Sequence, residues 1–149
     1  MKKNDNALVV EAVLQVSRPR ASRHAITRMV RGLARALGFT NGAITVIVVG
    51  ETTMVHLARS FLKKRGATNV LAFSYEKDAV RQRAVADIFI CQPVLLKEAQ
   101  RAGIAFSRRL AQLLIHAMVH VKGFDHKTQR AFRRMQRFEN RLWTRFYEQ

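Results

Sequence analysis

The hydrophobic and polar positions of this chain follow two alternating periods. Runs rich in β-branched residues predict four strands, at residues 7–16, 43–49, 69–75 and 85–90. Apolar residues spaced three and four apart predict five helices, which begin after Ser22, after Thr52 or Thr53, near Pro93, after Ser107 and at Lys127. This order predicts a mixed α/β (α+β) fold, with about four strands in a mixed sheet and about five helices in one compact domain over residues 1–149.

Two predicted elements differ from ordinary surface elements. Residues 43–49 are apolar throughout, which predicts a strand covered on both faces. Residues 110–121 are apolar nearly all round the helix, apart from Gln112 and two histidines, and therefore predict a central, buried helix. The charged stretch 76–83 is expected to separate the last two strands.

The net charge of the chain says more about its function than its size does. The 149 residues are 48% hydrophobic and 25% charged, which suits one folded domain, but 27 Lys and Arg against 10 Asp and Glu give a net charge of +17. That balance favours a polyanionic partner, with nucleic acid ahead of an anionic membrane surface. The single cysteine, Cys91, allows no internal disulfide, no secretory leader is evident after Met1, and no apolar stretch approaches the roughly 20 residues of a membrane span. We expect a cytoplasmic protein with no membrane partner.

The residues with the clearest chemistry lie at 116–126, which read His-Ala-Met-Val-His-Val-Lys-Gly-Phe-Asp-His. His116 and His120 are four residues apart, so on a helix they share one face and both reach one ion. Gly123 can take the left-handed conformation that ends a helix, which lets His126 fold back onto the same ion. A lone histidine is more often structural, but this spacing arises by chance in on the order of one sequence in a few thousand. The pattern predicts one metal ion bound by all three histidines.

The donor set favours zinc in a catalytic site. Three neutral imidazoles suit Zn²⁺ better than Mg²⁺ or Ca²⁺, which prefer oxygen. No fourth ligand stands at a matching spacing, which predicts an open coordination position where the ion polarises a phosphoryl oxygen or acidifies water. Asp125 is either a carboxylate that orients an imidazole or a solvated turn residue. Metzincin proteases share the histidine spacing, but their general-base Glu is replaced here by Ala117, which disfavours a protease.

These eleven residues resemble the signature of the YbeY family of bacterial endoribonucleases, which reads His-Gly-x-Leu-His-Leu-x-Gly-Tyr-Asp-His. Residues 68–73 are similar to the family's Thr-Asp-Val-Leu-Ser-Phe strand, and residues 86–88 to its Gly-Asp-Ile. Met135 and Glu139 also stand where the family places them on the last helix. The resemblance covers roughly residues 45–142.

The resemblance implies a function as well as a fold. It implies a single α/β domain, one Zn²⁺ per chain and cleavage of single-stranded RNA. It further implies a part in 16S rRNA 3′-end maturation and ribosome quality control. Ribosomal RNA and proteins of the small ribosomal subunit are the partners it implies, with no small-molecule cofactor.

The chain departs from the family pattern at several positions. Where the family's Leu-Asn-x-x-Tyr-Arg helix has Asn and Arg, alignment on Phe61 gives Ala58 and Leu62. The family arginine would be expected to grip phosphate or to stabilise the transition state. Asn69 in place of Asp removes a possible base, and Ala72 in place of Ser removes a hydroxyl. The residues expected to act in catalysis are therefore His116 and His120, with Lys63, Lys64 or Arg65 as substitutes for the arginine.

A basic stripe completes the candidate surface. The last predicted helix carries arginines at spacings of three and four, namely Arg130, Arg134, Arg137, Arg141 and Arg145. An apolar stripe follows one residue later, at Ala131, Met135, Phe138, Leu142 and Phe146. Arginine also recurs on the first helix, at Arg28, Arg31 and Arg35. We predict that Lys64 and the stripe from Arg130 to Arg141 contact RNA phosphates without reading sequence.

Two functions remain open on the sequence alone. The first is a metal-dependent endoribonuclease, a hydrolase of RNA phosphodiester bonds. The second is a non-catalytic RNA-binding ribosome-assembly factor that keeps the metal site, and it rests on the departures at Leu62 and Asn69.

Overall fold

The computed structural model describes residues 7–63, 65–78 and 80–147. The described residues form four strands and five helices, as the sequence predicts. In chain order these are β1 (Leu8–Leu14), α1 (Arg23–Ala36), β2 (Asn41–Val49), α2 (Glu51–Leu62), β3 (Val70–Asp78), β4 (Arg83–Cys91), α3 (Gln92–Ala102), α4 (Phe106–Lys122) and α5 (Gln129–Tyr147).

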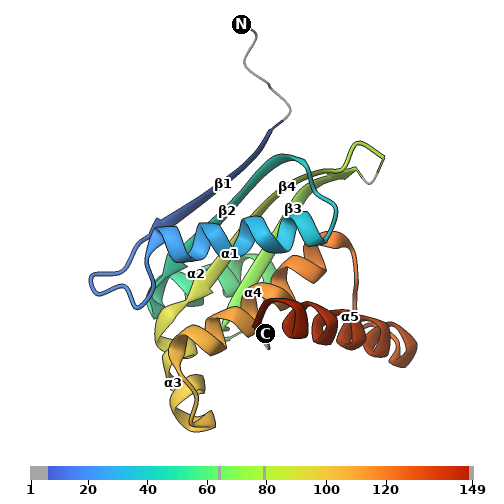
Figure 1. Cartoon of the computed structure of the whole chain (residues 1–149). Coiled ribbons are helices and arrows are strands. Elements are labelled where there is room, and N and C mark those ends of the chain that lie inside the picture. Colours follow the sequence, from blue (N-terminus) through green and yellow to red (C-terminus); the bar gives the residue numbers. More distant parts are fainter. Residues whose placement is uncertain (1–6, 64, 79, 148–149) are drawn as a thin grey trace, which may run out of the picture.

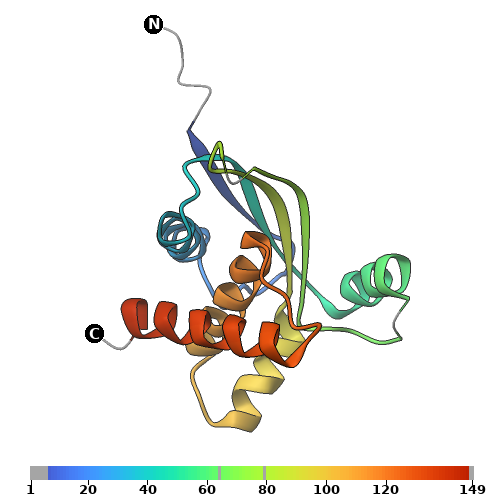
Figure 2. The ribbon, with the colours of Figure 1, turned by 90° about the vertical axis from the view of Figure 1, so that its right-hand side faces the viewer.

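The four strands form one mixed sheet in the order β1-β2-β4-β3. β1 and β2 are parallel, as are β2 and β4, and β3 runs antiparallel to β4. Helices α1 and α4 lie on one face of the sheet and α2 lies on the other, while α3 and α5 pack against α4 (Figures 1 and 2). The mixed α+β fold is therefore confirmed.

Apolar burial follows these layers. The larger core lies between the sheet, α1 and α4, and a smaller one under α2 contains Met54, Leu71 and Cys91. Strand β2 is buried at every position from 46 to 49 but alternates before that. Coverage on both faces is therefore confirmed only for the half of the strand that α2 reaches. None of the helices formed by the described residues is long and apolar enough to cross a membrane.

The helix starts were predicted with mixed success. The Ser22 hydroxyl accepts a hydrogen bond from the Ala25 amide at 3.0 Å and caps α1, as predicted. The predicted caps at Thr52 or Thr53 and at Ser107 are wrong, because α2 follows Gly50 and α4 follows Ala105 without a side-chain cap. Helix α2 starts at Glu51, just before the two threonines, and α4 starts at Phe106, just before Ser107. The three hydroxyl side chains therefore lie within the first turn of each helix.

The charged stretch 76–83 contains the break between the last two strands, as predicted, but its two ends are themselves part of the strands. It extends both of them, so that β3 continues to Asp78 and β4 begins at Arg83. The Arg83 guanidinium donates to the Glu76 carboxylate at 3.1 Å, which joins the two strands of the hairpin. In the register Glu76 is opposite Val85, so the ion pair with Arg83 is a diagonal cross-strand contact, which also stabilises strand pairing.

Candidate metal centre

The end of α4 and the loop after it bring the three histidines into one region. Gly123 takes a left-handed conformation, with φ of 113°, and its amide donates to the His120 carbonyl at 2.9 Å. The chain then reverses, and Phe124 stacks on Phe138 of α5 with ring centroids 4.8 Å apart. The Thr128 hydroxyl accepts from the Ala131 amide at 3.0 Å and caps α5. The reversal therefore holds the loop that carries His126 against α4 and α5.

His116 and His120 point their ring nitrogens at the same spot. Their Nε2 atoms are 3.2 Å apart. Two nitrogens bound to one tetrahedral zinc at 2.0–2.1 Å lie about 3.3 Å apart. The i, i+4 spacing that the sequence predicted to share one face thus gives a separation that fits two ligands of one ion.

Glu139 of α5 holds the first of these imidazoles in place. Its Oε1 atom lies 2.7 Å from Nδ1 of His116, with the two side chains 26% and 41% exposed respectively. A carboxylate that accepts from Nδ1 fixes the tautomer and turns the Nε2 lone pair outward, which is the usual arrangement behind a metal-binding histidine. Sequence reasoning placed Glu139 by family resemblance alone and gave it no role.

His120 is held in its neutral form. Burial lowers the pKa of His120, and the neighbouring His116 and His126 lower it further, although a hydrogen bond with the Phe124 backbone opposes the shift. A lowered pKa keeps the imidazole neutral at pH 7. Only a neutral imidazole offers a lone pair to a metal, so this shift favours ligation.

His126 is the third candidate ligand and is less fixed by its surroundings. Its ring centroid lies 5.4 Å from that of His120, and its side chain is exposed on the loop. Within the described parts of the chain, no three His, Cys, Asp or Glu side chains stand together in an arrangement that could hold an ion. The donor chemistry of three imidazoles nevertheless suits zinc, and the Nε2 separation of His116 and His120 fits two ligands of one ion.

A pocket opens beside these side chains. It has a volume of about 280 Å³ and lies between the histidine loop and α5, lined by His116, His126, Phe132, Met135, Gln136 and Glu139. Nine residues of α4 are buried, as its apolar sequence predicts. The two histidines, however, lie on its partly exposed face rather than in the core. On this exposed side His116, together with His126 of the loop, lines the pocket.

Asp125 acts as a turn residue in this structure. Its carboxylate accepts from the Lys127 amide at 3.1 Å, and its side chain is exposed. An Asx turn of this kind explains the residue without any metal. Of the two alternatives that the sequence left open for Asp125, the structure favours the turn, and Glu139 takes the orienting position instead.

The structure does not place the other predicted catalytic residues against the histidines. Lys63 ends α2 and Arg65 follows on the same exposed turn, and in the described portion neither side chain forms an ion pair. Lys64 lies outside the described residues. Because α2 is on the opposite face of the sheet from α4 (Figure 2), roles for Lys63, Lys64 and Arg65 at the RNA stay predictions.

Asn69 has a structural role that the sequence did not reveal. Its amide Nδ2 donates to both carboxylate oxygens of Glu98, at 3.1 and 3.2 Å, and Glu98 also forms an ion pair with Arg109 at 3.3 Å. An Asp at this position would bring a second carboxylate against Glu98 instead of a donor. The amide therefore matches the carboxylate of Glu98.

We expect Asn69→Asp to lower the free energy of unfolding by about 1–2 kcal/mol, because a charge-assisted hydrogen bond becomes a like-charge contact. Denaturant unfolding at pH 7 measures the change. The double variant Asn69→Asp/Glu98→Gln should recover most of the loss, since it restores a donor opposite a carboxylate. Equal stability of Asn69→Asp and the unaltered chain would contradict this account.

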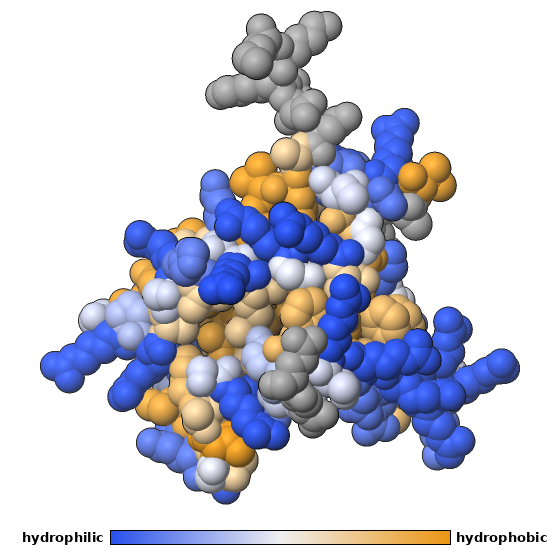
Figure 3. All heavy atoms as spheres, viewed as in Figure 1, coloured by the Kyte–Doolittle hydropathy of each residue, from blue (hydrophilic) through white to orange (hydrophobic). Residues whose placement is uncertain are grey.

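The arginine stripe of α5 faces solvent as predicted. All five arginines of the stripe are exposed, whereas Met135 and Leu142 of the apolar stripe are buried. Among the described residues none of the five forms an ion pair, and the one carboxylate of α5, Glu139, is turned toward His116. Figure 3 shows hydrophilic side chains gathered over α5. The stripe is thus an unneutralised positive surface on the helix that lines the histidine pocket.

Comparisons with known proteins identify the family of this chain. The family model described as Endoribonuclease YbeY matches residues 12–147. Proteins named Endoribonuclease YbeY from Acidovorax sp. (strain JS42) and Aromatoleum aromaticum are 40% and 32% identical over 71% and 81% of this chain. The match spans 65% of the length of the Acidovorax protein and 77% of the Aromatoleum protein.

The solved structures include one with the same fold. The solution structure of TM1509 from Thermotoga maritima superposes with a TM-score of 0.59 at 18% identity, covering 95% of this chain and 92% of that one. At that identity the likeness speaks for the fold alone. With the family match over 12–147 and the histidine motif, it leads to one conclusion: this chain belongs to the YbeY family.

Proposed function

We propose that this chain is a zinc-dependent endoribonuclease that cuts single-stranded RNA. Its proposed setting is 16S rRNA 3′-end maturation and ribosome quality control, with ribosomal RNA and small-subunit proteins as partners. The 3.2 Å approach of the His116 and His120 nitrogens, in a chain of the YbeY family, supports this most directly. Relatives at 40% and 37% identity carry the name Endoribonuclease YbeY.

The side chains divide the work between binding the ion and binding the strand. His116, His120 and His126 would hold the zinc, which supplies a Lewis acid for phosphodiester cleavage. Glu139 keeps the Nδ1 proton of His116 and thereby directs its Nε2 lone pair to the pocket. The exposed arginines of α5 bind phosphates of the strand that enters the pocket. In this division the proposed zinc site and the phosphate-binding arginines lie on neighbouring faces of α4 and α5.

Cleavage of a single-stranded RNA by the purified chain, beside the variant His116→Ala/His120→Ala, tests this function. A contaminating nuclease would survive those substitutions, whereas an activity of this chain would not. Retention of the activity in the variant would overturn the proposal.

A second candidate function is a non-catalytic RNA-binding assembly factor that keeps the metal site. The observation that favours it is Leu62, which is 43% exposed at the end of α2 where the family has an arginine. An apolar side chain cannot bind a phosphate. If metal-loaded protein binds RNA but never cuts it, even with Leu62→Arg, the assembly factor becomes the better account.

RNA binding should depend strongly on salt through the α5 stripe. We expect Arg134→Glu/Arg141→Glu to weaken binding of a single-stranded RNA about tenfold at low salt and to reduce the slope of log Kd against log salt by about 1.4, because roughly two phosphates are no longer neutralised. Fluorescence anisotropy at several salt concentrations measures both. The control Arg59→Glu/Arg101→Glu makes the same change in net charge on α2 and α3. Equal affinities for the two double variants would remove the stripe from the interface.

A further inference from the structure

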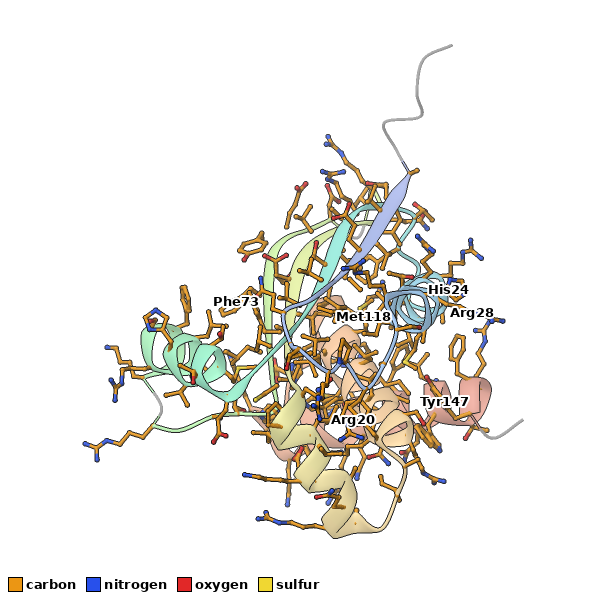
Figure 4. All side chains as sticks on the ribbon, turned by 90° about the vertical axis from the view of Figure 1, so that its left-hand side faces the viewer. Arg20, His24, Arg28, Phe73, Met118 and Tyr147 are labelled. Carbon is orange, nitrogen blue, oxygen red and sulfur yellow. The ribbon has the colours of Figure 1, made fainter. Side chains whose placement is uncertain are left out.

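A second concave surface lies away from the histidines, between α1 and the end of α5. This α1–α5 groove has a volume of about 740 Å³. Its lining comes from both helices and consists of His24, Ala25, Arg28, Met29, Arg31, Gly32, Arg35, Phe146 and Tyr147. Figure 4 shows His24 and Arg28 on the side of α1 near the end of α5, where Tyr147 lies.

The groove is positively charged without local neutralisation. Arg28, Arg31 and Arg35 follow one another at spacings of three and four, and all are exposed. The sequence contains no Asp or Glu between residues 12 and 50, so α1 supplies no carboxylate to pair with them. Within the described residues none of these three arginines forms an ion pair. A helix face that carries only one sign of charge attracts a polyanion.

The lining of the groove is partly apolar. The Phe146 ring lies so close to Gly32 that a Cβ there would come within 3.2 Å of it, and the Phe146 side chain remains 38% exposed. The Arg145 guanidinium stands 5.6 Å from the centre of the same ring. Burial raises the pKa of Tyr147 to about 12, so its phenol is neutral beside the arginines. A partly exposed ring in a positively charged groove is a surface on which a nucleobase stacks.

The groove and the histidine pocket lie along the same helix. Glu139 lines the pocket and Phe146 lines the groove, seven residues further along α5. At 1.5 Å per residue this is about 10 Å along the helix axis. Arg141 and Arg145 of the α5 stripe lie between these two positions in the sequence. One RNA molecule can therefore reach both surfaces.

We propose that the α1–α5 groove is a second RNA-binding surface, which holds backbone phosphates of the same RNA whose single-stranded segment enters the histidine pocket. RNA fits the groove better than a membrane does, because the charges line a concavity and Phe146 is the one large apolar side chain among the lining residues that is exposed. The proposal rests on RNA being the substrate of the proposed function, but not on its cleavage.

Binding of two RNA lengths tests the groove. The groove variant Arg28→Gln/Arg31→Gln/Arg35→Gln is compared with Arg59→Gln/Arg81→Gln/Arg101→Gln, which removes the same charge from other surfaces. All proteins carry His116→Ala/His120→Ala, so that the RNA stays intact and the outcome does not depend on nuclease activity. The probes are single strands of about 6 and about 24 nucleotides, the first near the lower end of the range for one single-strand binding site and the second well above that range.

The longer RNA should show the effect. Because the groove variant lacks three charges that bind phosphates, we expect it to bind the long strand about 30-fold more weakly than the control does, while the short strand loses much less. A charge-retaining variant, Arg28→Lys/Arg31→Lys/Arg35→Lys, should bind the long strand nearly as tightly as the control. Equal affinity and equal salt slope of the groove variant and its control for the long strand would overturn the proposal. The proposal would also be overturned if the groove variant bound RNA like its control but bound vesicles of phosphatidylserine and phosphatidylcholine more weakly. The groove would then be a membrane-binding surface.

Discussion

The variant His116→Ala/His120→Ala is expected to lose RNA cleavage by a factor on the order of 10³ or more, to the level of a reaction without protein. The reason is geometric, because these are the two imidazoles whose Nε2 atoms approach to 3.2 Å. Neither one alone offers a site for the ion that the proposed reaction needs. Cleavage of an end-labelled single strand, followed on a sequencing gel at saturating protein, measures the loss.

The matched control for this prediction is His56→Ala. His56 is an exposed histidine of α2, which lies on the opposite face of the sheet (Figure 2). This variant should cut RNA at the rate of the unaltered chain. Circular dichroism should show the same helix content for all three proteins, since His116 and His120 are only partly buried. A double variant that is folded and still cuts at more than about a tenth of the original rate would contradict the metal mechanism.

Glu139→Gln should weaken zinc binding by a factor of about 10–100, while the three histidines remain in place. The Glu139 carboxylate accepts the Nδ1 proton of His116 at 2.7 Å and so favours the tautomer with a free Nε2 lone pair. A neutral amide holds that proton less strongly and can itself donate. Competition for zinc against a coloured chelator at pH 7 measures the affinity.

Glu98→Gln is the control for this substitution. Glu98 is 28% exposed against 26% for Glu139 and also forms an ion pair, but with Arg109 rather than with a histidine. Any general effect on zinc affinity of losing a half-buried carboxylate should therefore appear in both variants. If both bind zinc as tightly as the unaltered chain does, Glu139 does not position His116.

The parts of the fold that the sequence predicted are those fixed by local patterns. The periodicity of 110–121 and the left-handed Gly123 lie within one stretch of the chain, and they led to α4, its end and the shared face of His116 and His120. The Ser22 cap could be predicted because the hydroxyl bonds to an amide only three residues away. Interactions over three or four residues leave a readable spacing.

The parts that the sequence missed depend on long-range contacts. Glu139 lies 23 residues after His116, and no spacing marks that pair, because it exists only once α5 has packed on α4. Asn69 meets Glu98 across 29 residues in the same way. Asp125 is a local exception: it is adjacent to a histidine and so looked equally suited to orient one, but its carboxylate accepts from the Lys127 amide two residues away. For Glu139 a family resemblance was the only available signal, and it gave no role for this residue.

The amount of zinc bound per chain tests the central claim most directly. Protein purified without chelators, repleted with zinc and freed of excess metal should contain one zinc per chain by elemental analysis, and His116→Ala/His120→Ala treated in the same way should contain almost none. This result is expected because three neutral imidazoles select zinc over oxygen-preferring ions. Less than about a tenth of an equivalent of zinc or any other transition metal in the unaltered chain would contradict the account.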